Sequence, residues 1–139
     1  MKIFVAASYS AKVDYTTGNV YPEYKEWLEA ILRQLENYGH EVFCALEADG
    51  WRINDMSPAQ AFKLDESEIA KADGMLALVS NAVSAGVQME IGMAIAQKKQ
   101  VVLAHDSIDQ LAYFNQAVVS LGQAGEAILP ITSDPFTSE

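Results

Sequence analysis

Short apolar runs alternate along the chain with longer segments in which apolar residues recur every three or four positions. The runs are typical of strands buried on both faces of a parallel sheet, and the periodic segments are typical of helices with one buried face. The predicted strands are residues 2–7, 41–46, 74–79, 100–104 and 126–131, and the predicted helices are residues 22–38, 58–72, 84–99 and 108–121. This alternation predicts an α/β fold with a doubly wound, five-stranded parallel sheet flanked by helices.

The helix boundaries carry their own signals. Pro22 suits the first position of one helix and Gly39 its end, while Ser57 followed by Pro58 is typical of an N-cap and a first turn. The aromatic residues of the first helix share its apolar stripe, so we interpret them as packing rather than as a surface on which bases stack. We therefore expect a flavodoxin-like architecture in one domain that spans residues 1–139.

Two loops follow the first two predicted strands at their carboxyl ends, the edge where open α/β sheets bind ligands. The first, residues 8–21, is longer than most strand-to-helix connections. Its candidate ligand contacts are Ser8, Tyr9, Ser10 and Lys12, unless the segment is an ordinary surface loop. In the second, residues 47–56, Trp51 either stacks on a planar ring or covers the core.

Composition narrows the range of partners. The chain has 139 residues, half of them hydrophobic, and a formal net charge of −10. Such an acidic surface repels phosphate backbones, so we expect no polymeric nucleic acid partner, although a small nucleoside or mononucleotide needs only a few local donors. Cys44 is the only cysteine, which excludes a disulfide framework and a cysteine metal site and suits a reducing compartment.

The sequence also bears on localisation and cofactors. No apolar run approaches membrane-spanning length, and the amino-terminal residues do not resemble a signal peptide. We therefore expect a cytoplasmic protein with no membrane contact, no bound metal and no cofactor. His105 follows a predicted strand and could titrate near neutrality, but a single histidine in a loop is more often incidental.

Glu90 is an acid in an otherwise apolar predicted helix, residues 84–99. We expect this helix to be covered on most faces, so the carboxyl group loses water unless another group pairs with it. Because Glu90 lies about one turn inside the positive end of the helix dipole, we expect it to be ionised. No Arg or Lys lies within one turn, so Glu90 is a candidate nucleophile or base; alternatively it pairs with a distant lysine or caps a neighbouring loop.

Asp65 is a second acid on an apolar helix face. It lies on the stripe formed by Phe62, Ile69 and Ala72 in the predicted helix 58–72. In a doubly wound fold the two acid-bearing helices flank neighbouring strands, so Asp65 and Glu90 are expected to line one cavity. Two buried carboxylates in different surroundings are the usual means of cleaving a glycosidic bond.

The residues around both acids resemble those of a known family. The matching segments are residues 3–8, Asp65 with residues 69–78, and the pattern Gly86-x-x-x-Glu90-Ile91-Gly92-x-Ala94. In combination they resemble the nucleoside 2-deoxyribosyltransferases and their relatives, the deoxynucleoside 5′-monophosphate N-glycosidases and CMP hydrolases. The resemblance runs from Lys2 to about Asn115.

The resemblance implies roles for individual residues. Glu90 falls on the nucleophile that forms an ester at C1′, and Asp65 on the carboxylate that assists departure of the base. Ser84 and Gly86 fall at the substrate, and a serine at position 84 resembles the monophosphate glycosidases. Asn115 falls where a neighbouring subunit contacts the 5′ group of the sugar, as in the transferases, which implies a homodimer or a larger homo-oligomer.

Two positions depart from the family pattern. Phe4 replaces a tyrosine whose hydroxyl group binds the nucleophile, so Glu90 is expected to use Tyr9 or a water molecule instead. The first loop also lacks the glycine- and arginine-rich phosphate cradle of the monophosphate glycosidases.

The function expected from these residues is cleavage of the N-glycosidic bond of a nucleoside or nucleoside 5′-monophosphate, with transfer of the sugar to another base or to water. The alternative is a non-catalytic nucleotide sensor that keeps the pocket, with Phe4 marking lost chemistry. A phosphate-binding flavodoxin-like domain is less consistent with the sequence, because no glycine-rich loop follows the first strand.

Overall fold

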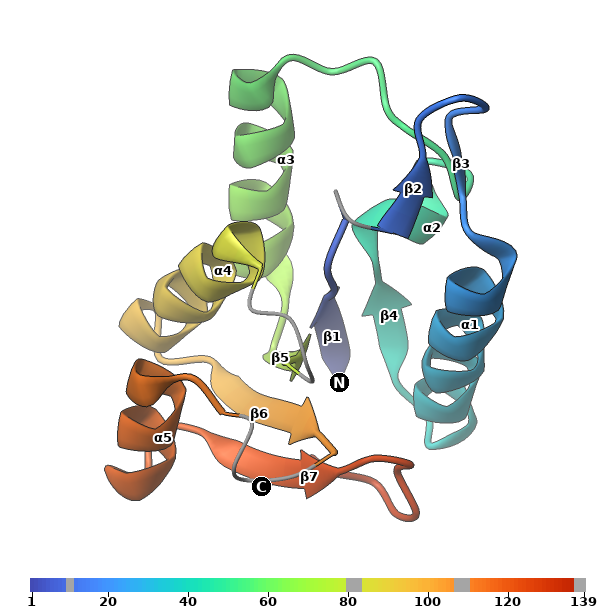
Figure 1. The fold of residues 1–139 in the computed structure, drawn as a ribbon. Helices are drawn as coiled ribbons and strands as arrows, with labels where there is room; N and C mark the ends of the chain where they lie inside the picture. The colour runs from blue at the N-terminus through green and yellow to red at the C-terminus, as the bar shows by residue number, and fades with distance from the viewer. Residues whose placement is uncertain (10–11, 80–83, 107–110, 137–139) are drawn as a thin grey trace.

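The computed structural model describes residues 1–9, 12–79, 84–106 and 111–136. Five parallel strands form one sheet in the order β4-β1-β5-β6-β7 (Figure 1). The strands are β1 Lys2–Ala6, β4 Glu41–Phe43, β5 Gly74–Leu78, β6 Gln100–His105 and β7 Gly125–Ile128. The helices are α1 Pro22–Asn37, α2 Ala45–Ala48, α3 Pro58–Lys71, α4 Ala85–Ala96 and α5 Tyr113–Ser120. The predicted flavodoxin-like parallel sheet is confirmed.

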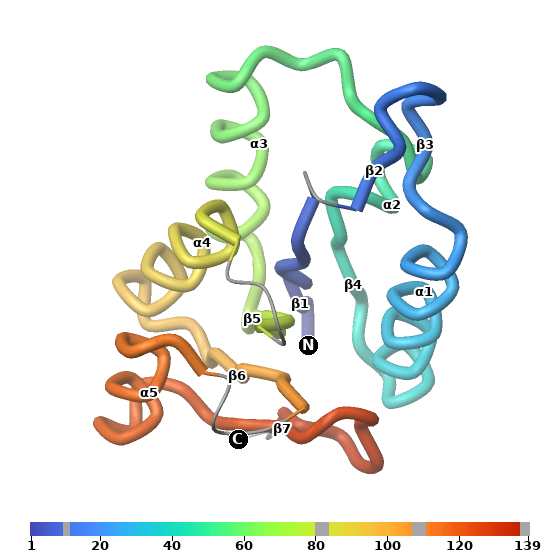
Figure 2. Tube along the Cα trace, viewed as in Figure 1, coloured from blue at the N-terminus to red at the C-terminus, as the bar shows by residue number. Residues whose placement is uncertain are grey.

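Helices cover both faces of the sheet. Helix α1 lies on one face, and helices α3, α4 and α5 lie on the other (Figure 2). Along β1, Ile3 and Val5 point into the core beneath α1, whereas Phe4 and Ala6 point into the core beneath α3 and α4. This alternation explains why β1 is a continuous apolar run, because both of its faces are buried.

Local signals fix the starts of the two helices that carry the acids. Helix α3 begins with a capping box in which the Ser57 hydroxyl accepts a hydrogen bond from the Gln60 amide and the Gln60 side chain accepts one from the Ser57 amide. Helix α4 is capped by Ser84, whose hydroxyl accepts a hydrogen bond from the Val87 amide at 3.4 Å. Each cap sets the register of its helix, and therefore the direction in which its acid points.

The segment predicted as an irregular loop, residues 8–21, contains a short antiparallel hairpin. Strands β2 Val13–Asp14 and β3 Asn19–Val20 pair with each other, and Gly18 adopts a φ of +78° in the turn between them. Backbone hydrogen bonds then tie this hairpin to residues 51–53, from the Val20 amide to the Trp51 carbonyl and from the Ile53 amide to the Gly18 carbonyl. The two loops at this edge of the sheet therefore form one unit.

Several predicted boundaries were wrong. Strand β4 was predicted to extend to residue 46, but it ends at Phe43 and is followed by helix α2. The prediction failed because a short apolar stretch such as residues 44–46 is compatible with either a strand or a helix. Strand β7 ends at Ile128 rather than at residue 131, and helix α4 ends at Ala96. Helix α5 occupies Tyr113–Ser120; the predicted start at residue 108 lies outside the described residues.

Two predictions of burial were also wrong. Phe62 is 41% exposed, because the amino-terminal half of α3 projects beyond the sheet and only its last turns reach the core (Figure 1). Helix α4 is not covered on most faces, since Met89 is 59% exposed. Within the described part of the chain, no helix is long and apolar enough to cross a membrane.

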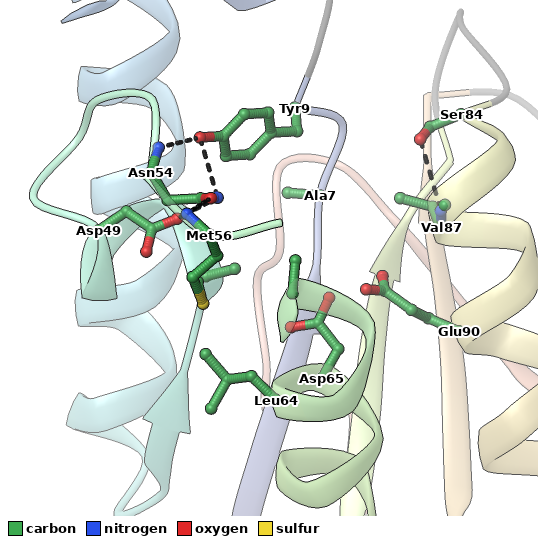
Figure 3. Close-up of a pocket in the computed structure, with 13 residues that line it drawn as sticks. Ala7, Tyr9, Asp49, Asn54, Met56, Leu64, Asp65, Ser84, Val87 and Glu90 are labelled. Atoms are coloured by element: carbon green, nitrogen blue, oxygen red, sulfur yellow. Dashed lines mark hydrogen bonds between the residues drawn. The ribbon is translucent and has the colours of Figure 1, made fainter. Parts of the chain in front are cut away.

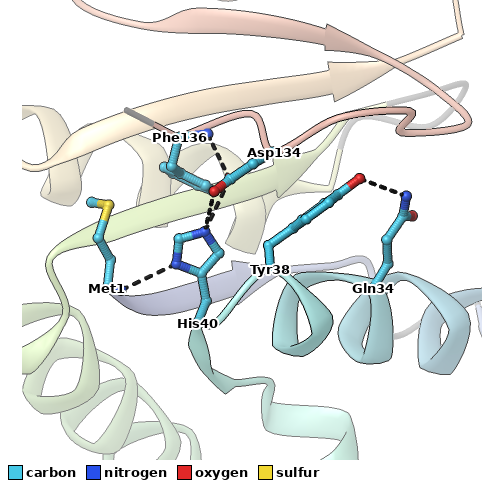
Figure 4. A network of polar contacts seen from close by, with 6 residues as sticks. All are labelled: Met1, Gln34, Tyr38, His40, Asp134 and Phe136. Carbon is cyan, nitrogen blue, oxygen red and sulfur yellow. Dashed lines mark hydrogen bonds and ion pairs between the residues drawn. The ribbon is translucent and has the colours of Figure 1, made fainter. Parts of the chain in front are cut away.

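The carboxy-terminal segment packs at the amino ends of the strands, opposite the edge that carries the loops (Figure 4). The His40 imidazole lies with Nε2 2.9 Å from Asp134 Oδ1 and Nδ1 3.1 Å from the Met1 nitrogen. The Phe136 amide donates to Asp134 Oδ1, and the Phe136 ring meets the His40 ring edge-on at 5.7 Å. Gly74 permits this packing, since a Cβ there would lie 3.0 Å from Phe136 Cε1.

Candidate active site

A cavity of about 230 Å³ opens at the carboxyl edge of the sheet. One wall is formed by helices α3 and α4, which contribute Asp65 and Glu90 (Figure 3). The opposite wall is formed by Tyr9, which follows β1, and by Asp49 and Asn54 from the segment between α2 and α3. This is the edge at which ligands bind in open α/β sheets.

Asp65 and Glu90 meet in this cavity. They come from different helices, α3 and α4, and each carboxyl group changes the pKa of the other. The prediction that the two acids line one cavity is confirmed. None of the described residues that line the cavity is a lysine or arginine, so an ion pair to Glu90, the alternative left open by the sequence, is not observed among the described residues.

The two acids differ in charge. Burial raises the pKa of Glu90 to about 9, and the hydrogen bond and negative charge of Asp65 contribute to the increase. Burial also raises the pKa of Asp65, but its hydrogen bond to Glu90 opposes this increase. The pair therefore carries one proton at neutral pH, and in the free protein that proton resides on Glu90.

The expectation of an ionised Glu90 in the free protein was therefore wrong. Glu90 is the sixth residue of α4, which places it in the second turn. The field of the helix dipole falls off within the first turn, whereas burial and a second carboxyl group act on Glu90 directly. The sequence placed both acids in one cavity but did not indicate that Asp65 would raise the pKa of Glu90.

A small void of about 20 Å³ lies behind Glu90. Phe4 and Cys44 line it together with Glu90, and burial raises the pKa of the Cys44 thiol to about 11, so the thiol is neutral. The void is large enough for one water molecule. Phe4 offers no hydroxyl group to Glu90, in agreement with the departure noted in the sequence.

Tyr9 is not the substitute partner of Glu90. Its hydroxyl group donates to the Arg52 carbonyl oxygen at 3.3 Å and accepts a hydrogen bond from the Asn54 amide at 2.9 Å. Tyr9 therefore joins the first loop to the 51–54 segment, and although it also lines the small void, its hydroxyl group is bound to that segment rather than to Glu90. Of the two substitutes expected from the sequence, a water molecule remains.

Asp49, Asn54 and Met56 line the cavity but were not singled out in the sequence. The Asn54 side chain donates to Asp49 Oδ2 at 3.3 Å and accepts from the Met56 amide at 3.0 Å. The sequence signal that could have pointed to these residues is their place in a loop that follows a predicted strand at its carboxyl end. Trp51, the residue chosen there, does not line the cavity but packs against the core beneath α1.

The remaining candidates from the sequence separate into two groups. Ser84 and Gly86 line the cavity at the start of α4. Ser8 does not line it, and its carbonyl oxygen accepts a hydrogen bond from the Tyr24 hydroxyl group at 3.0 Å. Lys12 also lies elsewhere, with its ammonium group 5.2 Å from the centre of the Tyr24 ring; Ser10 lies outside the described residues.

Asn115 and His105 lie away from the cavity of their own chain. Asn115 is 2% exposed, and its side-chain amide forms two hydrogen bonds with that of Gln88, at 2.8 and 3.0 Å. His105 is the last residue of β6 rather than a loop residue, and its fully buried ring places Nε2 2.9 Å from Glu126 Oε2. Among the described residues, no cluster of His, Cys, Asp and Glu could hold a metal ion.

A parallel α/β sheet with two acids in a cavity at its carboxyl edge is an arrangement suited to an enzyme that acts on a small molecule. Comparison with known sequences identifies the family. The sequence profile of the family described as nucleoside 2-deoxyribosyltransferase matches residues 15–128. The chain belongs to this family, whose members act on nucleosides. A comparison with curated proteins returned no match.

Solved structures agree with this assignment. The CMP N-glycosidase BcmB of Clostridium botulinum is 26% identical with a TM-score of 0.68, over 92% of this chain and 88% of that one. BlsM is 25% identical with a TM-score of 0.70, over 93% of this chain and 80% of that one. A 2-deoxyribosyltransferase of Bacillus psychrosaccharolyticus is 21% identical with a TM-score of 0.59, over 82% and 79%, and shares the fold.

Proposed function

We propose that this protein cleaves the N-glycosidic bond of a nucleoside or a nucleoside 5′-monophosphate, with Glu90 as nucleophile and Asp65 as general acid. The observation that carries the proposal is the position of two partly buried carboxyl groups in one cavity, where each changes the pKa of the other. Such a pair supplies one anion and one proton, the two things that displacement of a base from C1′ requires. Membership of the family supports the same class of reaction.

The reaction begins with a proton shift within the pair. The proton on Glu90 moves to the Asp65 carboxyl group in the same cavity, which leaves Glu90 ionised and Asp65 protonated. A Glu90 oxygen then forms a bond to C1′ while the bond between C1′ and the base nitrogen breaks. The electron pair of that bond passes to the base, which takes the proton from Asp65.

The second half of the reaction reverses these roles. Asp65, now ionised, accepts a proton from water or from an incoming base. That acceptor attacks C1′ and displaces Glu90, which releases the free sugar or a new nucleoside. The site therefore supports both hydrolysis and transfer, and the two differ only in which acceptor occupies the position left by the base.

The test is base release measured by chromatography over a panel of nucleosides and nucleoside 5′-monophosphates. We expect Glu90→Gln to abolish release and Asp65→Asn to lower it by about 100-fold or more. Glu26→Gln is the matched control, because Glu26 is exposed on α1. Turnover that is unchanged in Glu90→Gln would contradict the proposal. Omission of the acceptor base distinguishes hydrolysis from transfer.

One observation favours the alternative function, a non-catalytic nucleotide sensor. Glu90 has no hydroxyl partner from Phe4, and the Tyr9 hydroxyl group is bound to Arg52 and Asn54. A sensor would show a rise in melting temperature with a member of the same panel but no base release. A release rate that depends on Glu90 would exclude it.

We also propose that a second copy of the chain covers part of α4 and α5. Three large apolar side chains on these helices are exposed, namely Met89 (59%), Tyr113 (83%) and Phe114 (76%). Exposed apolar side chains gathered on neighbouring helices are typical of an interface. Asn115 is already bound to Gln88, so Tyr113 and Phe114 are better placed to reach a neighbour. We expect light scattering to give a dimer or larger, and Phe114→Asp to give a monomer.

A further inference from the structure

We propose that Asp49 recognises an exocyclic amino group on the nucleobase, so that the site prefers cytosine- and adenine-type bases to their keto counterparts. The inference rests on the proposed function, because it assigns the base to the wall opposite Glu90. The inference follows from three observations: the order of the acids in the cavity, the carboxylate oxygen of Asp49 that has no hydrogen-bond partner among the described residues, and the contacts by which Asn54 positions Asp49.

Three acids line the cavity in a row. Glu90 and Asp49 each interact electrostatically with Asp65. In the close-up, Glu90 lies at one side of the cavity, Asp65 in the middle and Asp49 at the far side (Figure 3). With C1′ at Glu90 and the departing nitrogen at Asp65, the far edge of the base extends towards Asp49.

Asp49 is positioned to accept a hydrogen bond. Its Oδ2 accepts from the Asn54 side chain at 3.3 Å, whereas Oδ1 has no partner among the described residues. An ionised carboxylate only accepts hydrogen bonds, so it suits an amino group and repels a carbonyl oxygen. Burial and the charge of Asp65 raise the pKa of Asp49, and the hydrogen bond from Asn54 opposes this effect.

Asn54 fixes the position of this carboxylate. The Met56 amide donates to Asn54 Oδ1 at 3.0 Å, which assigns the oxygen and nitrogen of the Asn54 side chain without ambiguity. Its nitrogen therefore faces Asp49 Oδ2 and, at 3.4 Å, the Tyr9 hydroxyl group. All of these contacts lie within the wall, so Asn54 is a positioning residue rather than a group left for substrate.

Apolar groups complete the same part of the cavity. Met56 and Leu64 line it beside Asp49 and Asp65 (Figure 3). A flat ring inserted between them would lose its contact with water on both faces while its polar edge meets Asp49. This combination of apolar faces and one charged acceptor is suited to a base rather than to the phosphate group of a nucleotide.

The test compares two pairs of 2′-deoxynucleosides that differ only at the relevant group: deoxycytidine with deoxyuridine, and deoxyadenosine with deoxyinosine. The 5′-monophosphates of the same four are run in parallel. We expect kcat/KM to favour the amino member of at least one pair by about 10- to 100-fold. Asp49→Asn should bring this ratio close to one, because an amide also donates to a carbonyl oxygen. Asp55→Asn, at an exposed neighbour outside the cavity, should leave the ratio unchanged.

Binding to the Glu90→Gln protein separates this inference from the proposed function. Calorimetry should show tighter binding of the amino member of the pair, and the double variant with Asp49→Asn should lose that preference. If no base is released but this preference is seen, the inference stands and the proposed reaction falls. If release depends on Glu90 but the ratio is unchanged in a folded Asp49→Asn protein, the inference is wrong. Equal binding of both members, or binding of neither, also overturns it.

Discussion

The carboxyl groups of Asp65 and Glu90 line one cavity although they belong to different helices, α3 and α4, and the negative charge of Asp65 helps to raise the pKa of Glu90. A partly buried site with no described lysine or arginine in its lining does not readily hold two negative charges. The pair therefore retains one proton at neutral pH. Both the proposed activity and the free energy of unfolding should therefore depend on whether this proton is bound.

The pH dependence of kcat/KM should be bell-shaped. The active form has one proton on the pair, so activity is lost on the acid side when the pair takes up a second proton. It is lost on the alkaline side near pH 9, where the pair loses its proton. A profile of base release from pH 4 to 10 checks this prediction. A rate that is flat from pH 7 to 10 would mean that the proton is not used.

Glu90→Gln should make the protein more stable at neutral pH. The folded-state pKa of Glu90, about 9, lies above the ordinary glutamate value of 4.5, so between these values the unfolded chain releases a proton that the folded protein keeps. Stability therefore falls as pH rises through this interval, and glutamine removes the penalty. We expect a gain of about 1–3 kcal/mol at pH 7.

Denaturant unfolding at pH 5 and pH 8 measures this effect. The advantage of Glu90→Gln over the wild type should be larger at pH 8, because the wild type has lost more stability there. Glu26→Gln on the exposed surface of α1 should show no such dependence. An advantage that is equal at both pH values would assign it to packing rather than to the proton.

Phe4→Tyr should lower the pKa of Glu90. The void of about 20 Å³ that Phe4 and Glu90 both line has room for a hydroxyl group, and a hydrogen bond to the ionised carboxylate favours the charged form. We expect the alkaline limb of the activity profile to move to lower pH. Phe43→Tyr is the control, because this neighbouring ring, 5.6 Å from Phe4, does not line the void. An unshifted limb in a folded Phe4→Tyr protein would refute the prediction.

Gly74→Ala should destabilise the fold without touching the cavity. A Cβ at this position would lie 3.0 Å from both the Gln100 carbonyl oxygen and Phe136 Cε1, and a backbone oxygen within a sheet cannot move away easily. We expect a loss of about 1–3 kcal/mol, seen as a lower melting temperature. Gly125→Ala is the matched control, because its nearest neighbours lie 3.9 Å away. Equal melting temperatures for the two variants would contradict the prediction.

The sheet was predictable because its central strands are buried on both faces. Continuous apolar runs marked β1, β5 and β6 to within about one residue of their observed bounds. The pattern failed at the periphery of the sheet, where residues 44–46 could extend a strand or begin a helix. It also missed the hairpin of β2 and β3, because two-residue strands are too short to show alternation.

The two walls of the cavity also differed in how far the sequence predicted them. Asp65 and Glu90 were recognisable because helix periodicity placed an acid among apolar residues. Asp49 and Asn54 lie in a segment with no periodicity, and their contribution depends on a hydrogen bond that only the folded chain reveals. The charge state of Glu90 was mispredicted for a related reason, since it depends on the distance between two helices.

The capping box at the start of α3 separates the two walls of the cavity. Because Ser57 and Gln60 define the first turn of this helix by themselves, the orientation of Asp65 does not depend on the residues that precede the cap. A change at positions 49–56 is therefore expected to reshape the far wall of the cavity while Asp65 keeps its place on α3.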